Sequence, residues 1–113
     1  MDLTKEKIKE LKEAHPEGIF EGAISFDDAE GKSHNVEFVY RKPTIADGES
    51  YAKATQKSVP VANLNYIQSL VIFPEPVTVI DQLRDYPAAY GNFVNEALNP
   101  FFGANYSAKS RKL

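Results

Sequence analysis

The sequence contains no cysteine and no tryptophan, and it has a single methionine. Without cysteine the chain can form neither a disulfide nor a thiolate metal site, and a reducing compartment fits this composition. Its apolar runs are much shorter than the ~18 residues that a helix needs to cross a bilayer. The N-terminal residues alternate in charge and lack the apolar centre of a signal peptide. We therefore expect a soluble, cytoplasmic protein without a membrane partner.

An excess of positive charge is also missing. Thirteen lysines and arginines stand against sixteen aspartates and glutamates, which gives a formal net charge of −3. Because a dedicated nucleic-acid-binding domain usually carries a basic face, we expect no nucleic-acid partner. A chain of 113 residues is long enough for one modest core. We expect one α+β domain over residues 1–102 and a flexible basic tail at 103–113, which is either mobile or ordered only on a partner.

The first third of the chain predicts a helix and a β-hairpin. Residues 3–15 carry a narrow apolar stripe between lysines and glutamates, which is typical of an amphipathic surface helix. Residues 18–26 and 34–42 alternate between apolar and polar side chains, as half-buried strands do. The polar, glycine-containing residues 27–33 have the length of a hairpin connection. The side chains expected on the inner face are Phe20, Gly22, Ile24, Phe26, Val36, Phe38 and Tyr40.

The stretch "YRKPTIAD" (residues 40–47) predicts a change from strand to helix. Pro43 has no N–H to donate, so it ends the strand. Thr44 and Asp47 have nearly the spacing of a capping box, so a helix begins there. Arg41 and Lys42 are expected to be exposed and to pair with acidic residues of the later helices, namely Glu75, Asp81, Asp85 and Glu96. The new helix places Ile45, Gly48, Ala52 and Thr55 on one face.

The rest of the chain predicts further helices. Residues 59–73 favour a buried helix that ends before Pro74, with a strand at 69–73 as the alternative. Thr78 and Asp81 repeat the capping spacing before a short helix, and Pro87 suits the first turn of a last helix that Pro100 ends. This last helix is expected to bury Ala89, Phe93, Ala97 and either Val94 or Leu98. The fold class is therefore α+β: an N-terminal helix, a two-stranded antiparallel β-hairpin, and a helical C-terminal half of three to four helices.

No set of residues indicates catalysis or metal binding. His15 and His34 lack the partners of a general base or a zinc site, so we assign both a structural or surface role. The acidic residues 27–30 lack the alternating ligands of a calcium loop. Asp81 and Asp85 have no partner histidine or second carboxylate pair for acid–base chemistry. We expect no enzymatic activity, no cofactor and no metal.

Three short motifs accompany this order of elements. Arg41 to Thr44 form an Arg-Lys-Pro-Thr step into a helix; Leu70, Val71 and Pro74 form an "LV…P" helix end; and Tyr86 with Pro87 opens the last helix. In this order and in these motifs the chain resembles small phage and prophage proteins related to tail assembly chaperones. Two features differ from those proteins: the tail after Phe102, which has no apolar periodicity, and the polar, glycine-containing second helix.

The resemblance implies a non-enzymatic role in the cytoplasm of a bacterial host. Such a protein holds an aggregation-prone tape-measure protein soluble while the tail tube polymerises. The alternative is a structural virion protein, such as a head–tail or tail-completion component, or a phage protein with another role. Homo-oligomerisation stays open.

A chaperone of this kind needs exposed apolar surface for a protein client. The candidates lie beside or beyond the core stripes, and the basic pair at the strand end is a secondary contact: Tyr51, Tyr66, Tyr90, Phe101, Phe102, Arg41 and Lys42. Single apolar residues on a surface are normal. The alternative is therefore that Phe101 and Phe102 fold back onto the last helix.

Overall fold

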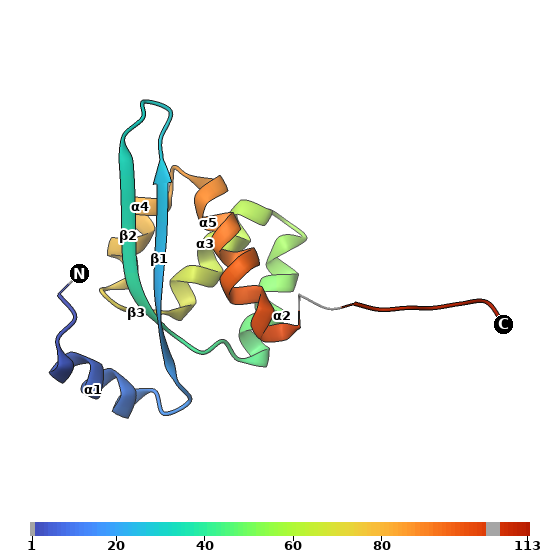
Figure 1. The fold of residues 1–113 in the computed structure, drawn as a ribbon, viewed down its shortest axis with the longest axis horizontal. Coiled ribbons are helices and arrows are strands. Elements are labelled where there is room, and N and C mark those ends of the chain that lie inside the picture. The colour runs from blue at the N-terminus through green and yellow to red at the C-terminus, as the bar shows by residue number, and fades with distance from the viewer. Residues whose placement is uncertain (1, 104–106) are drawn as a thin grey trace.

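The computed structural model describes residues 2–103 and 107–113 of the chain. Its elements follow one another as α1 (Lys5–Ala14), β1 (Ile19–Asp27), β2 (Ser33–Arg41), α2 (Ile45–Thr55), α3 (Val59–Leu70), β3 (Val71–Phe73), α4 (Pro76–Leu83), α5 (Pro87–Phe93), η1 (Val94–Leu98) and η2 (Asn99–Phe102). A long hairpin forms one layer, and the helices of the C-terminal half pack against one face of it (Figure 1). This arrangement confirms the α+β fold class.

The sheet has one strand more than the sequence predicted. β1 and β2 pair antiparallel along their whole length. β3 then pairs antiparallel with the end of β2, so the strand order is β1-β2-β3. Helix and strand, the two alternatives for residues 69–73, therefore both occur: the helix ends at Leu70, and a strand begins at Val71. A consequence of this order is that β1 lies at the edge of the sheet.

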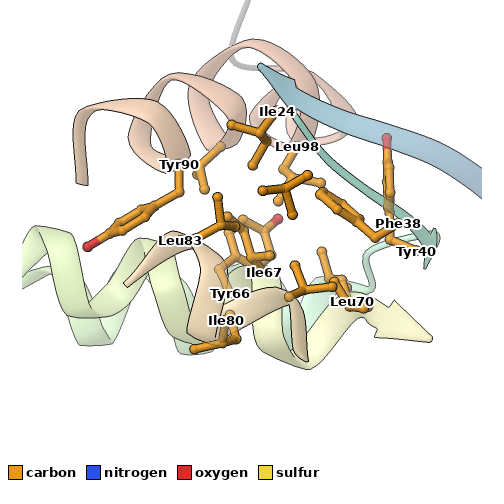
Figure 2. Packing of buried hydrophobic residues seen from close by; sticks show 14 residues of the cluster. Ile24, Phe38, Tyr40, Tyr66, Ile67, Leu70, Ile80, Leu83, Tyr90 and Leu98 are labelled. Carbon is orange, nitrogen blue, oxygen red and sulfur yellow. The ribbon is translucent and has the colours of Figure 1, made fainter. Parts of the chain in front are cut away.

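The core lies between the inner face of the sheet and α3, α4, α5 and η1. Figure 2 shows Phe38 and Tyr40 of β2 packed among apolar side chains of these helices, with Leu83 and Leu98 fully buried. The alternation in β2 predicted this burial correctly. Phe20 near the start of β1 was expected in the core, but 37% of it is exposed; its ring stacks on the buried Tyr40 ring and meets the partly buried Phe101 ring edge-on.

Two helix boundaries differ from the prediction. α4 begins at Pro76, so Thr78 lies inside the helix and caps nothing. Proline at the first position sets the helical φ angle and needs no N–H partner, which makes it a sufficient start. The last helix does not end at Pro100. It changes from α-helix to a π turn at η1 and then to the 3₁₀ turn η2, whose first turn contains Pro100.

Gly22 permits the closest approach between sheet and helices. It pairs with Phe38 across the hairpin, and a Cβ at Gly22 would lie 2.6 Å from Cε2 of Phe38 and 3.1 Å from Cζ of Phe93. The Phe38 ring is completely buried and has no free space to move into, so any side chain at Gly22 displaces the two rings. Because Gly22 has no side chain, the rings of Phe38 and Phe93 can pack against the backbone of β1.

We therefore expect Gly22→Ala to lower the free energy of unfolding by about 1–3 kcal/mol, the range for overpacked cores. Urea denaturation at neutral pH measures this change. Glu21→Ala is the matched control, because Glu21 is the exposed neighbour in the same strand and surface substitutions change stability by less than about 0.5 kcal/mol. Equal effects of the two substitutions would show that Gly22 has no special packing role.

Candidate functional site

An ion pair joins the end of β2 to the start of α2. Nη1 of Arg41 lies 2.7 Å from Oδ2 of Asp47, and Nη2 lies 3.0 Å from Oδ1. Nη2 also donates to the carbonyl oxygen of Ser69 at 3.1 Å, near the end of α3. Both charged side chains are largely buried, with 22% and 15% exposed. One guanidinium group thus fixes three elements relative to one another.

Asp47 also caps α2, as the sequence predicted. Its Oδ2 accepts bonds from the backbone N–H of Thr44 at 2.8 Å and from the Thr44 hydroxyl at 2.9 Å, and its own N–H donates to Oγ1 of Thr44 at 3.3 Å. Chiefly because of the Arg41 guanidinium, the pKa of Asp47 falls to about 2. The carboxylate is therefore charged at all ordinary pH values.

The expected exposure is confirmed for Lys42 and wrong for Arg41. Lys42 is exposed. Arg41 is partly buried, and its partner comes from the adjacent helix start and not from the acidic residues of the later helices. The sequence prediction failed because strand alternation gives the face of a residue but not the reach of a long side chain at a strand end.

Two of the candidate tyrosines are core residues. Tyr66 and Tyr90 are 4% and 3% exposed, and both belong to the buried cluster in Figure 2. Tyr90 was therefore wrongly predicted to lie on a binding surface, whereas Tyr66, although almost fully buried, is one of the residues that line a surface hollow. Burial raises the pKa of Tyr66 to about 12. A tyrosine at such a position contributes packing area, and its ring supports the half-buried Tyr51 at a centroid distance of 4.7 Å.

Tyr51 and Phe102 do meet at the surface. They line a hollow of about 320 Å³ between α2 and η2, which we call the α2–η2 hollow; the residues around it are Ile45, Gly48, Glu49, Tyr51, Ala52, Tyr66, Asn99 and Phe102. The Phe102 ring packs over Gly48, where an added Cβ would lie 3.3 Å from it. Tyr51 is anchored below by a 2.6 Å bond from its hydroxyl to Oδ1 of Asn63. Phe101 instead packs back on Phe20, at a centroid distance of 5.2 Å.

The most exposed apolar residue of this hollow is one that the sequence did not single out. Ile45 is 76% exposed and Phe102 is 43% exposed. The helical face through Ile45, Gly48 and Ala52 was visible in the sequence, but a stripe of this kind normally faces a core. Here no residue of α2 is fully buried. On this face of α2, Ile45 and Ala52 are therefore exposed, while the Phe102 ring covers Gly48 between them.

Within residues 2–103 and 107–113, no group of three or more histidine, aspartate or glutamate side chains is arranged to hold a metal ion. His34 stacks on Phe26 at a centroid distance of 4.8 Å, and its Nε2 lies 2.9 Å from Oδ2 of Asp28. Asp28 also accepts bonds from the N–H groups of Glu30 and Lys32, so it closes the hairpin turn. The hydrogen bond with His34 lowers the pKa of Asp28. These contacts give the acidic tip a structural role.

Comparison with known proteins shows the fold and no function. No protein-family model matches the sequence, and no curated protein matches it. Among solved structures, an uncharacterised protein from Bacillus stearothermophilus aligns with a TM-score of 0.66 and 20% sequence identity, covering 93% of this chain and 99% of that chain. Identity at this level shows a shared fold alone. Across the part of the chain that the structure describes, no helix is both long enough and apolar enough to cross a membrane.

The ion pair predicts unequal effects for two adjacent basic residues. Arg41→Ala leaves the largely buried Asp47 carboxylate without its charged donor, so we expect the free energy of unfolding to fall by about 2 kcal/mol. Lys42→Ala is the matched control and should change it by less than about 0.5 kcal/mol. Arg41→Lys should recover little, because an ammonium group cannot form the two parallel bonds. Urea denaturation of the three variants tests this, and equal losses at both positions would contradict it.

The low pKa of Asp47 also predicts how stability depends on pH. A carboxylate whose pKa is lower in the folded state stabilises the fold above its unfolded pKa, about 3.9, and this contribution is lost as the pH falls toward the folded value. We expect the stability advantage of the wild type over Asp47→Asn to be full above about pH 5 and to shrink toward about pH 2. Urea denaturation across this range measures it. A constant difference between the two proteins would contradict the ion pair.

Proposed function

We propose that this chain is a non-enzymatic phage or prophage protein of the tail-assembly-chaperone type. It binds an apolar helical segment of a client, such as the tape-measure protein, at the α2–η2 hollow. The observation that carries the proposal is the exposed apolar face of α2, on which Ile45 is 76% exposed. The motifs at Arg41–Thr44 and Tyr86–Pro87, which resemble those of tail assembly chaperones, support the same class.

The shape and chemistry of the hollow favour a helix as the bound element. Ala52 is exposed on α2, one helical turn from Gly48, which the Phe102 ring covers. The small side chain of Ala52 leaves room for an approaching helix. Tyr51 and Phe102 provide aromatic walls. Its volume of about 320 Å³ is at the lower limit of small-molecule sites, which span ~300–1,000 Å³. A few aliphatic side chains of an amphipathic helix, spaced three or four residues apart, fit this surface.

The Arg41–Asp47 ion pair and the hydrogen bond from Tyr51 to Asn63 hold α2 in place, but neither contact is part of the binding surface. Arg41 holds the first turn of α2 through Asp47, and Tyr51 holds the second turn through Asn63. A helix held by these contacts keeps its apolar face outward and does not sink into the core. In this proposal Arg41 positions the binding surface, and Lys42 beside it is free to contact an acidic rim of the client.

Ile45→Asp should abolish client binding and leave the fold intact. Ile45 is the first residue of α2, where a negative charge interacts favourably with the helix dipole. Co-expression with the tape-measure protein encoded by the same phage or prophage, followed by affinity purification, measures binding. Val77→Asp is the matched control, because Val77 is an exposed apolar residue in the first turn of α4. Loss of the client with Ile45→Asp alone is the expected result.

Two outcomes would contradict the proposal. The first is co-purification of equal amounts of client with both variants, which would show that the hollow is not part of the binding surface. The second concerns the assembled particle, because a chaperone leaves before the virion is complete. Detection of this chain at a fixed stoichiometry in purified virions by mass spectrometry would instead support a structural head–tail or tail-completion component.

A further inference from the structure

A second surface runs along the open edge of β1. A groove of about 810 Å³ is lined on one side by the consecutive residues from Ala23 to Asp28. Because neighbouring residues of a strand point to opposite faces, a groove lined by consecutive residues follows the edge of the strand and not one of its faces. The strand order leaves this edge unpaired within the described part of the chain. Its backbone N–H and C=O groups are therefore available to an added strand.

The opposite wall of the groove is one face of the last helix. Its side chains are mainly small, and two of them are aromatic: Tyr86, Pro87, Ala88, Ala89, Asn92, Phe93, Glu96 and Ala97. Small residues there leave room for a backbone beside β1. An extended segment in this groove would hydrogen-bond to the strand edge and place alternate side chains against the helix, which is the geometry of β-strand addition.

The rim of the groove is acidic. Asp27, Asp85 and Glu96 line it and are exposed, while Asp28 lies deeper and is paired with His34. No lysine or arginine lines the groove. An occupant with positive charges at alternating positions would complement this rim, and an acidic segment would be repelled.

The C-terminal tail has the matching chemistry. Residues 107–113 are exposed and form neither helix nor strand, and they contain Lys109, Arg111 and Lys112 without any acidic residue. Of the thirteen basic residues, ten remain in residues 1–102 with all sixteen acidic ones, so the domain carries −6 and the tail +3. Seven residues at ~3.3 Å each span ~23 Å, which is enough to cover the lined part of β1, five residues or ~17 Å long.

The tail follows η2, at the end of the last helix. η2 packs on α2, where Phe102 covers Gly48, whereas the groove runs from the hairpin tip and the start of α5 to Ala97. Figure 1 shows residues 107–113 pointing away from the domain and from β1. A second molecule can present its tail to the groove without folding back along its own last helix.

We call the groove between the edge of β1 and the last helix the β1–α5 groove. We propose that the basic tail of one copy of this chain binds in the β1–α5 groove of a second copy as an added strand. Each molecule then supplies one tail and one groove. A contact between two different surfaces closes into a tail-exchanged dimer or a ring, or extends into a chain. This inference does not rest on the proposed function, because the groove and the α2–η2 hollow share no lining residue.

Sedimentation velocity of the full-length protein over a range of concentrations tests the proposal. We expect concentration-dependent association that weakens at least tenfold when the salt is raised from about 0.05 to 0.3 M, because partly exposed charges are screened. Lys109→Glu with Arg111→Glu and Lys112→Glu should abolish it, and so should Asp85→Lys with Glu96→Lys. Combining both sets in one chain should restore it, since the charges are then exchanged.

A matched control separates the groove from net charge. Glu6→Lys with Glu13→Lys changes the total charge by the same amount as the groove variant, on exposed positions of α1, and should leave association unchanged. The proposal is overturned by a wild type that stays monomeric at all concentrations, which includes the case of a tail folded onto its own groove. It is equally overturned by a tail variant that associates as the wild type does, or by an exchanged variant that stays monomeric while folded by circular dichroism.

Discussion

The ion pair between Arg41 and Asp47 determines how the sheet leads into the helices. Arg41 is the last residue of β2, Asp47 belongs to the first turn of α2, and the same guanidinium group binds the carbonyl of Ser69 near the end of α3. α2 has no fully buried side chain, and Tyr51 is its one large side chain that packs against the core. This bidentate contact and the hydrogen bond from Tyr51 to Asn63 therefore hold the helix, and with it the α2–η2 hollow.

Local patterns in the sequence were sufficient for most of the fold. The alternation in residues 34–42 gave β2 and its buried face, and the capping residues Thr44 and Asp47 gave the start of α2. β3 was left open, because a three-residue strand depends on pairing with Val39 and Tyr40, some thirty residues earlier. The continuation of the last helix past Pro100 was missed for a related reason. It depends on a change of helical winding that residue preferences do not reveal.

The candidate site was predicted only in part. Tyr51 and Phe102, two of the candidates, line the same hollow, and the structure adds Ile45. Tyr66 and Tyr90 are both almost fully buried, because large aromatic rings beside a core stripe add packing area to the core; Tyr66 still lines the hollow. The β1–α5 groove had no local signal, since its walls come from segments about sixty residues apart. The basic tail was predicted to be either mobile or ordered only on a partner, and the acidic rim of the groove emerges only when the chain is folded.

Hydrogen exchange of α2 tests most directly whether the Arg41–Asp47 ion pair holds this helix in place. The comparison is between the wild type and Arg41→Ala, with amide exchange followed by mass spectrometry under native conditions. The account predicts that the amides of α2 exchange faster in Arg41→Ala while those of β1, β2 and α3 keep their protection, because local opening needs less free energy than global unfolding. Unchanged protection in α2, or a uniform loss across the whole domain, would contradict it.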